Sequence, residues 1–488
     1  MASELPLVIV GAGIAGVCAA LAAAPRPVLL LSRGGDASGG GTAASAMAQG
    51  GIAAAVGPAD STALHAVDTV AAGAGHNHAA MVQLLVAAAP EAIGWLQSQG
   101  VRFDRDGQQL HLGREGGHGL ARVVHAGGDR SGATVMAALH ARVRDAAHIA
   151  RRDDADVEAL LLCDGRAAGV RVRSAAGRCE EIEAAAVVLA TGGIGALFAH
   201  TTNPAGSSGA GLALALAAGA RTRDLEFVQF HPTALATRGR SLPLITEALR
   251  GAGARLCDGH GRPLMAGVHP LGDLAPRDIA ARRVWQAQRE GTAWLDTSAL
   301  PAGWEQGFPA VMATCLSNGI DPRVSMIPVT AAAHFHMGGI ATDADGCTSV
   351  PGLYAVGEVA CNGAHGANRL ASNALLEGVV FGRRLGEHLA GVTPWPTRLQ
   401  SCAPTMQWAQ RGACLAQDKL ASLRDILWSA AGPVRSAEAI RTGMAAAEAL
   451  AADGWQGRVA LALLRSALQR GHSLGAHWRE DALMAEPG

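Results

Sequence analysis

Short apolar runs and Ala-rich helical stretches alternate at the start of the chain. Residues Leu7–Val10 are all aliphatic, which predicts a buried strand. The stretch over residues 14–24 reads as a helix that ends at Pro25 and Pro27, and residues 28–32 form a second apolar run. This strand–helix–strand succession predicts a parallel sheet covered by helices.

The alternation of apolar runs with Ala-rich stretches continues along the chain and is then interrupted. It predicts helices over residues 79–99 and 206–219 and strands over 171–173 and 184–190. Between Phe227 and His336 prolines, histidines and arginines are dense, and the strand–helix pattern returns at Gly352. The end of the chain is predicted to be helical, most clearly over 406–428 and 436–452. We therefore expect an α/β fold with a discontinuous Rossmann-like domain, an inserted α+β capping domain and a C-terminal helical domain. The expected bounds are 1–224 and 339–400 for the first domain, 225–338 for the second and 401–488 for the third.

A glycine-rich turn joins the first predicted strand to the first predicted helix. Its glycines are Gly11, Gly13 and Gly16. The first permits a tight turn, the second lets the backbone approach a pyrophosphate, and the third allows close helix–strand packing. The helix beginning at Ile14 offers free N–H groups to the anion. The second strand ends in Ser32-Arg33, where an NAD-binding unit usually has an acid, and this counts against an ordinary NAD-dependent dehydrogenase.

Composition narrows the class of protein. The 488 residues are enough for two or three domains, and the 49% apolar content suits a buried core. A net charge of −1 argues against nucleic acid or an anionic membrane as partner. The nine cysteines are scattered without a CxxC pair, which indicates reduced thiols and no zinc or iron–sulfur site. No apolar run reaches the roughly 18 residues that span a bilayer, and the first strand begins too early for a signal peptide. We expect a cytoplasmic protein without a metal.

Further motifs follow the opening fingerprint in order. Glycine-rich segments read AQGG (48–51), ATGG (190–193), SGAG (208–211) and VGE (356–358). Segments with His, Arg and Glu read QFHP (229–232), ITEALRG (245–251), APRD (275–278), AHFHMGG (333–339) and GANRL (366–370). Together they resemble the flavoprotein family of fumarate reductase, succinate dehydrogenase and L-aspartate oxidase, over nearly the whole chain. The resemblance implies FAD as cofactor, held by Gly11, Gly13, Ile14, Gly16, Ser32, Arg33, Ala48, Gln49, Gly50, Gly51, Ala190, Thr191, Gly192, Gly211, Glu358, Ser372, Asn373 and Leu375.

The family's chemistry is hydride transfer between a four-carbon dicarboxylate and flavin N5. A dicarboxylate presents two planar anions, which Arg binds bidentately and which His or Thr completes with single donors. By resemblance, His334 and Arg369 hold one carboxylate, while His231 and Thr246 hold the other. The protein would supply orientation and electrostatics, and the flavin would take the hydride.

The resemblance assigns proton transfer to Arg277, linked through Glu247 and Arg250. A guanidinium has a pKa above about 12, so a lone arginine is an awkward acid or base. A relay in which Arg277 gives up a proton while regaining one from the Glu247–Arg250 pair avoids a long-lived neutral arginine.

Each of these residues has a plainer interpretation when it is considered alone. His231 would simply end a strand before a proline. His334 and His336 alternate as metal ligands would, but no carboxylate or Cys cluster accompanies them at metal spacing; His336 is assigned no role. Arg277-Asp278 would be a surface ion pair of little value. The ordered set of motifs favours the functional interpretation for all of them.

Two features distinguish branches of the family. Members with covalent FAD carry a linking histidine five residues before the Gln of AQGG, where this chain has Ala44, so noncovalent FAD is expected. The REGGH segment at 114–118 resembles the L-aspartate oxidase branch, in which the acid, here Glu115, faces the substrate's ammonium group. The plainer alternative for Glu115 is a solvated loop acid. Ala252 and Leu474 depart from the family, whose members usually carry Glu and Arg at these positions.

The resemblance therefore implies oxidation of L-aspartate to iminoaspartate, with FAD reoxidised by O2, giving H2O2, or by fumarate, giving succinate. This would be the first step of NAD biosynthesis through quinolinate, with functional coupling to quinolinate synthase. One alternative is a soluble fumarate reductase or succinate dehydrogenase type of flavoprotein with noncovalent FAD. A second, from another class, is an inactive FAD-binding assembly subunit.

Overall fold

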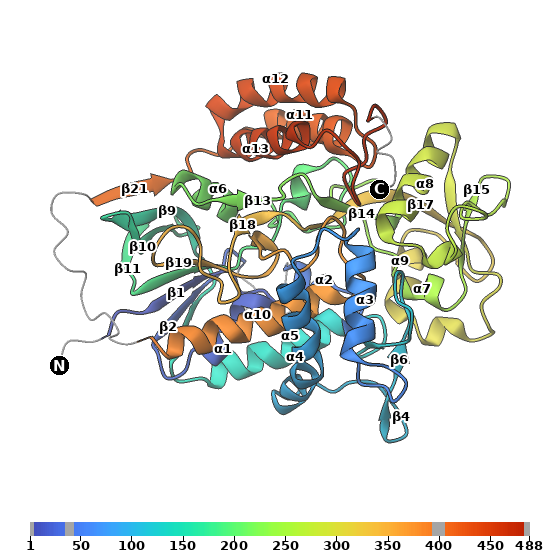
Figure 1. The fold of residues 1–488 in the computed structure, drawn as a ribbon, viewed down its shortest axis with the longest axis horizontal. Coiled ribbons are helices and arrows are strands. Elements are labelled where there is room, and N and C mark those ends of the chain that lie inside the picture. Colours follow the sequence, from blue (N-terminus) through green and yellow to red (C-terminus); the bar gives the residue numbers. More distant parts are fainter. Residues whose placement is uncertain (1–3, 35–42, 393–405, 483–488) are drawn as a thin grey trace.

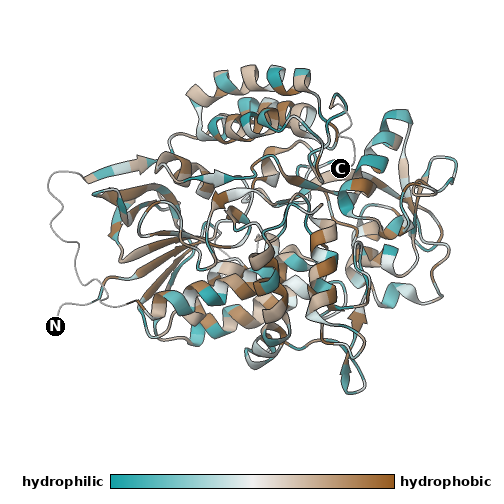
Figure 2. Cartoon of the chain, in the orientation of Figure 1, coloured by the Kyte–Doolittle hydropathy of each residue, from teal (hydrophilic) through white to brown (hydrophobic). Residues whose placement is uncertain are grey.

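A five-stranded parallel sheet lies at the centre of the computed structural model, which describes residues 4–34, 43–392 and 406–482 (Figure 1). Its strands, in the order β19-β12-β1-β2-β8, are Leu353–Ala355, Ala186–Leu189, Leu7–Val10, Val28–Leu31 and Ile149–Arg152. Alternate residues of β1 enter two apolar clusters, one on each face of the sheet. Burial on both faces explains why these strands are continuous aliphatic runs, drawn brown in Figure 2.

Helices cover the face of this sheet to which Leu7 and Ile9 point. Helix α1 (Ile14–Ala22) packs against α10 (Asn373–Ala390), so the beginning of the chain lies beside a segment more than 350 residues away. Helix α5 (Ser131–Asp145) packs on α1, and α4 (Ala79–Ser98) packs on α10. The predicted α/β fold class is confirmed, because parallel strands alternate with these helices.

A second, antiparallel sheet has the order β11-β10-β9-β21. Its strands are Cys179–Glu183, Arg166–Arg173, Asp156–Cys163 and Met406–Gln410. The sequence predicted a helix from residue 406, and this is wrong for Met406–Gln410. The segment pairs with the open edge of β9, from Met406 opposite Cys163 to Gln410 opposite Ala159, and this ladder satisfies backbone groups that a short helix would leave unpaired. The helix predicted there begins only at Gln417.

A third sheet, with the order β14-β17-β16-β15, stands on the other side of the molecule. Its antiparallel strands are Val228–Leu235, Ile327–His336, Ala293–Asp296 and Arg255–Asp258. Three helices accompany it, α7 (Ala248–Gly251), α8 (Arg277–Glu290) and α9 (Pro309–Ser317). The strand β14 carries the QFHP motif, β17 carries AHFH, and the first residue of α8 is Arg277.

Short elements complete the frame of the site. One three-stranded sheet has the order β13 (Thr222–Arg223), β18 (Gly339–Ala341) and β20 (Ala360–Cys361). A second has the order β3 (Ile52–Ala53), β7 (Val123–Val124) and β6 (Leu112–Gly113). The strands β4 (Arg105–Asp106) and β5 (Gln109–Leu110) form a two-stranded sheet. The remaining short or early helices are α2 (Ala44–Met47), α3 (Thr62–Ala72) and α6 (Ala210–Ala217), with 3-10 turns η1 (Gly195–Leu197), η2 (Gly272–Leu274), η3 (Trp304–Gln306) and η4 (Gly357–Val359).

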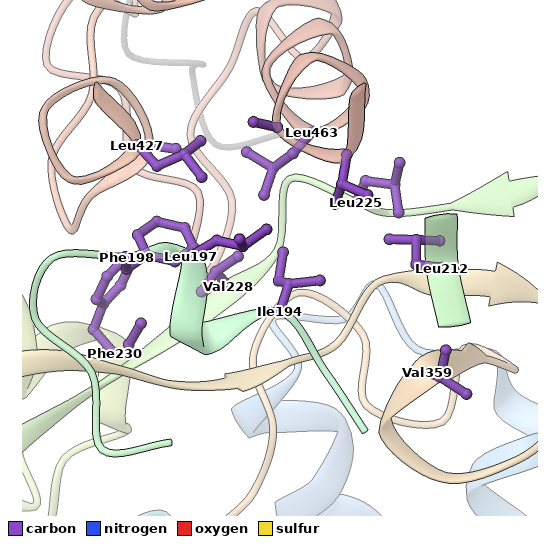
Figure 3. Close-up of a cluster of buried hydrophobic side chains, with 14 of the residues drawn as sticks. Ile194, Leu197, Phe198, Leu212, Leu225, Val228, Phe230, Val359, Leu427 and Leu463 are labelled. Carbon is purple, nitrogen blue, oxygen red and sulfur yellow. The ribbon is translucent and has the colours of Figure 1, made fainter. Parts of the chain in front are cut away.

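Three C-terminal helices form a layer above the first two sheets (Figure 1). They are α11 (Gln417–Ala431), α12 (Ala437–Asp453) and α13 (Trp455–Gln469). Leu427 of α11 and Leu463 of α13 point down onto Leu197, Phe198 and Val228 (Figure 3). The helical layer is therefore joined to the strands that carry the site through one continuous apolar core.

The structure bears on two compositional expectations, the absence of a membrane-spanning run and the reduced state of the cysteines. Within the described residues, one helix, α4, is long and apolar enough to cross a membrane by length and composition, although Gln83, Pro90 and Glu91 interrupt its apolar residues. Core helices of globular proteins pass the same test, and α4 buries Leu85 and Leu96 in the core beneath the sheet. Seven cysteines of the described ranges are free, but Cys163, at the end of β9, is disulfide-bonded, so the expectation of fully reduced thiols is wrong. The pairing of β9 with β21 places Met406 opposite Cys163.

Candidate active site

A cavity of about 620 Å³ opens at the carboxyl ends of the parallel strands. The segments that directly follow β1, β2, β12 and β19 line it, which is where ligands bind in open α/β sheets. Many of the residues expected to hold FAD are among the lining: Gly11, Gly13, Ile14, Ser32, Arg33, Ala48, Gln49, Ala190, Thr191, Gly192, Gly211, Glu358 and Leu375.

The turn after β1 is shaped for close approach of a ligand to the backbone. Gly11 has φ of +117°, a conformation that L side chains rarely adopt, and a Cβ there would clash with the carbonyl oxygen of Ala190. The first N–H of α1, at Ile14, donates to Ser45 Oγ at 3.1 Å. Ser45 belongs to α2 and also lines the cavity, so α2 lies across the anion-binding end of α1.

Several buried polar atoms in the wall have no hydrogen-bond partner among the described residues. Two of them, Gln49 Oε1 and Thr191 Oγ1, belong to residues expected to hold the cofactor. Buried polar groups in native proteins are nearly always hydrogen-bonded, so both atoms fit a wall that contacts a polar cofactor. The cavity, the glycine turn and these two atoms together suit FAD.

Five of the expected cofactor residues do not line the cavity: Gly16, Gly50, Gly51, Ser372 and Asn373. Ser372 Oγ donates to Glu115 Oε2 at 2.6 Å, and Asn373 Oδ1 lies 2.9 Å from His65 Nε2. Gly16 packs against the carbonyl of Gly11 inside the fold.

Glu247 lies between two arginines. Its carboxylate accepts from Arg277 Nε at 2.7 Å and is hydrogen-bonded to Arg250 Nη2, and all three side chains are buried. Burial alone would raise the pKa of Glu247, but Arg277 and Arg250 outweigh it and lower that pKa to about 2. The three residues that the sequence assigned to one relay are thus in direct contact.

Gln229, which the sequence analysis gave no role, connects two of the expected functional arginines. Its Oε1 accepts from Arg277 Nη1 at 3.2 Å and from Arg369 Nη2 at 3.1 Å. Its Nε2 donates to Asn368 Oδ1 at 2.8 Å and to the carbonyl of Arg369 at 2.7 Å, which fixes the orientation of the amide. The residue stood in the QFHP motif, but only tertiary structure shows that its amide faces both arginines.

Two histidines face each other across neighbouring strands. The rings of His231 on β14 and His334 on β17 have centroids 5.0 Å apart. Burial, followed by the charge of Arg277, holds both pKa values well below their usual range, so both rings are neutral. His334 Nδ1 lies 2.8 Å from Thr202 Oγ1, a partner that the sequence did not suggest. His231 Nε2 is buried without a partner, which leaves one nitrogen for a ligand.

Arg369 lines the cavity with His334 and is 3% exposed. Its guanidinium lies over the ring of Phe335 at 4.4 Å, and its Nε has no partner. Burial and repulsion from Arg277 lower the pKa of Arg369 to about 9. An anionic ligand would raise the pKa of Arg369 again, because its negative charge would offset both burial and the repulsion from Arg277.

The cluster of Glu247, Arg250, Arg277 and Arg369 carries a net charge of +2, because three guanidinium groups face one carboxylate and the neighbouring histidines are neutral. Thr246 is buried directly before Glu247, and its Oγ1 accepts from the N–H of Ala248 at 3.3 Å. A pocket with this charge suits a dianion of small size. No group of three or more potential metal ligands occurs among the described residues.

Glu115 is buried, not solvated. Ser372 donates to its Oε2, and His125 Nε2 lies 3.7 Å from its Oε1, which has no hydrogen-bond partner. Burial would raise the pKa of Glu115, but His125 and Ser372 keep it below its usual value. A Cβ on the next residue, Gly116, would clash with Glu247 Oε1, so the REGGH segment lies directly against the charged cluster. Glu115 is not part of the cavity wall itself.

Glu358 has a different environment. It follows β19, lines the cavity and accepts from the backbone N–H of His336 at 2.9 Å. Burial raises the pKa of Glu358 to about 7. His336 turns its Nε2 toward the carbonyl of Leu225 at 3.0 Å, so its side chain is used inside the protein.

Comparison with known proteins decides the family. A family model described as an FAD binding domain matches residues 7–375. The L-aspartate oxidase of Caulobacter vibrioides is 46% identical, over 98% of this chain and 94% of its own length. That of Agrobacterium fabrum is 44% identical, over 97% and 90%. The chain belongs to the L-aspartate oxidase family. FAD is its cofactor, and the enzyme class is that of the FAD-dependent oxidoreductases.

Solved structures agree with this membership. A quinol-fumarate reductase with menaquinol is 29% identical, with a TM-score of 0.89 over 98% of this chain and 92% of that one. The Mycobacterium smegmatis Sdh1 complex in the apo form is 29% identical, with a TM-score of 0.80 over 98% and 88%. The L-aspartate oxidase family therefore shares the fold of these flavoproteins, as the motifs predicted.

Proposed function

We propose that the protein is an L-aspartate oxidase that converts L-aspartate to iminoaspartate. The single observation that carries the substrate is the buried Glu115, whose Oε1 lacks a hydrogen-bond partner beside a cluster of net charge +2. The positively charged cluster suits the two carboxylates of the substrate. The carboxylate of Glu115 suits the ammonium group that distinguishes aspartate from succinate. Family membership over nearly the whole chain supports the same function.

The protein's own groups hold the dianion. Arg369 and His334 would bind one carboxylate from the cavity wall, where Arg369 Nε has no partner. His231 and Thr246 would bind the other, with His231 Nε2 also without a partner. Because both histidines are neutral, each offers one donor without adding charge, and the attraction rests on the arginines. Bound FAD would supply the hydride acceptor, and O2, giving H2O2, or fumarate, giving succinate, would be the final oxidant.

Proton movement would run through the contacts of Glu247. Arg277 would exchange a proton with the substrate and would restore its own protonation state by a proton exchange with the Glu247–Arg250 pair, to which it is hydrogen-bonded. The pKa of Glu247, which the two arginines lower to about 2, favours its ionised form, so Glu247 would carry the proton only in passing between Arg277 and Arg250.

FAD is proposed to be noncovalent, because Ala44, which lines the cavity, has no side-chain nucleophile. Acid precipitation of the protein should release all of the yellow colour into the supernatant. Flavin that stays in the pellet would refute this part of the proposal.

Several further assignments belong to the same proposal. The domain bounds are those expected above, the location is the cytoplasm, and the unstable imine product would be consumed in a second step by quinolinate synthase, toward NAD. Neither a fumarate reductase without amino-acid activity nor an inactive assembly subunit is favoured, because the curated relatives over nearly the whole chain are L-aspartate oxidases.

One experiment tests the proposed reaction. The FAD-bound protein is mixed under argon with L-aspartate, and flavin absorbance near 450 nm is followed; roughly complete bleaching is expected on turnover of a single equivalent. Succinate at the same concentration is the control and should bleach it far more slowly. Readmission of air should restore the colour and produce H2O2. Bleaching by succinate but not by L-aspartate would refute the proposal in favour of a succinate-type flavoprotein.

A further inference from the structure

A residue from the far end of the chain closes one wall of the cavity. Arg411 directly follows β21, is 3% exposed and lines the cavity with Arg33 and Asp156. Its backbone N–H donates to the carbonyl of Glu158 at 2.8 Å, so it continues the pairing of β21 with β9. Its Cζ lies 5.2 Å from the ring centroid of Trp455 at the start of α13.

Asp156 holds two arginines at this wall. Arg411 Nη1 and Nη2 donate to its two oxygens at 3.0 and 2.9 Å. Arg33 also contacts Asp156: Arg33 Nη2 donates to Asp156 Oδ2 at 3.0 Å, and Arg33 Nε lies 2.9 Å from Asp156 Oδ1. Burial would raise the pKa of Asp156, but the bond from Arg411 and the charge of Arg33 outweigh it and lower that pKa. The group carries a net charge of +1, and Arg411 Nε is buried without a hydrogen-bond partner.

The position of this group in the fold indicates which part of the cofactor it meets. Arg33 directly follows β2, and the end of the second strand of a dinucleotide-binding unit lies beside the adenosine ribose. The acid that usually binds the ribose there is missing, because Ser32 and Arg33 occupy the position. Asp156, supplied by β9, cannot replace it, since its oxygens are already occupied by both guanidinium groups. The groups that remain available to a ligand are cationic donors.

We propose that Arg411 is a cofactor-binding residue that contacts the ADP half of FAD, so that the C-terminal part of the chain contributes to cofactor retention. Asp156 positions Arg411 and balances part of its charge together with that of Arg33. Since β21 carries Arg411 to the cavity, FAD binding and the pairing of β21 with β9 stabilise each other, as linkage requires. The inference rests on FAD as the cofactor and does not depend on which substrate is oxidised.

The test measures binding rather than turnover. The FAD-free protein is titrated with FAD, followed by flavin fluorescence, and separately with ADP, followed by competition against FAD. Arg411→Gln should weaken FAD and ADP by the same factor, roughly tenfold or more, as expected when a charge-assisted donor is lost from a buried site. Arg411→Lys, which keeps the charge, should recover part of the affinity for both ligands.

The matched control is Arg171→Gln. Arg171 lies on β10 with its Cζ 4.4 Å from the ring of Trp408 of β21, so it also holds β21, but it does not line the cavity. This variant should weaken FAD and ADP binding by a much smaller factor than Arg411→Gln does, because it loosens β21 without removing a group from the cavity wall. Unchanged FAD affinity in Arg411→Gln would overturn the proposal. So would a loss for FAD without a loss for ADP, or an equal loss in Arg171→Gln, which would trace the effect to β21 docking alone.

Discussion

Arg277 and Arg369 share one acceptor, the Oε1 of Gln229, at 3.2 and 3.1 Å. Burial and the charge of Arg277 lower the pKa of Arg369, yet the neutral amide of Gln229 holds both arginines in one geometry. Arg277 begins α8 and Arg369 follows in a loop 92 positions later, so Gln229 joins the strand β14 to both sides of the proposed substrate position. The arrangement presents a prepositioned cationic pair to a dianion.

Gln229→Met should test this arrangement, because it keeps the length of the side chain and removes the shared acceptor. We expect kcat/KM for L-aspartate to fall by roughly tenfold or more, since misplacement by about 1 Å costs that much or more in an oriented site. FAD content should stay normal, because Gln229 does not line the cavity. Unchanged kcat/KM at full FAD occupancy would show that the arginines are positioned without the amide.

Arg369→Leu removes the guanidinium that lines the cavity beside His334. Truncating one partner of a buried charge-assisted contact costs about 2–5 kcal/mol. We expect kcat/KM to fall by at least roughly tenfold for both L-aspartate oxidation and fumarate reduction. Steady-state assays of both half-reactions at saturating FAD give the measurement, and near-native turnover with either substrate would remove Arg369 from the site.

Glu115→Gln separates the amino-acid substrate from the others. It keeps the shape of the side chain and removes the charge expected to face the ammonium group. Oxidation of L-aspartate should fall roughly ten- to a hundredfold in kcat/KM, since a charge-assisted partner is lost from a buried site. Fumarate reduction by chemically reduced enzyme should change little or improve, because it involves no ammonium group.

The same two assays of Glu115→Gln would also reveal whether Glu115 has a purely structural role. Equal loss of both activities would mean that Glu115 supports the fold through Ser372 and His125. No change in either would remove the best residue for aspartate over succinate. Glu115→Asp, which keeps the charge on a shorter side chain, serves as the companion variant and should retain part of the aspartate activity.

Buried histidines should make the protein less stable in mild acid. The folded-state pKa of His336 is lowered to about 4, chiefly by burial, whereas an unfolded chain protonates His near 6.5. The unfolded state therefore binds more protons between pH 6.5 and 4, and the stability contributed by the neutral ring is present above 6.5 and lost as pH falls through this window. His231 and His334 act in the same direction.

Thermal unfolding of the FAD-bound protein at pH 7.5 and pH 5.5 measures this effect. Tm should be lower by at least a few degrees at pH 5.5. His336→Gln lowers Tm at both pH values because its bond to Leu225 is lost, but it should show a smaller difference between them. An unchanged difference in this variant would show that His336 does not take part in the pH effect.

The elements that the sequence predicted well are those whose pattern is local. The aliphatic run of β1, the glycine turn and the helix from Ile14 follow from burial and backbone sterics within about 20 residues, and the structure has them with nearly the same bounds. The structure places His231 and His334 on the neighbouring strands β14 and β17. Their mutual contact at 5.0 Å was beyond the sequence, because it depends on the register of the two strands.

The segment Met406–Gln410 shows the opposite case. Its residues are compatible with a helix, and only the free edge of β9 makes a strand the more stable choice. Arg411 reaches the cavity for the same reason, so no local signal could have identified it. Gln229 and Thr202 were missed because their partners lie on other elements, more than 40 positions away in each case.

The sequence by itself determined the α/β fold class, the cofactor and the family, because glycine turns, aliphatic strands and ordered motifs are properties of short stretches of chain. Only the tertiary structure decided which charged side chains contact each other and which of them are buried. It placed Glu247 between Arg277 and Arg250, buried Glu115 beside them and brought Arg411 to the far wall. Those contacts join residues from separate elements, and their energies depend on burial and distance, which no linear pattern records.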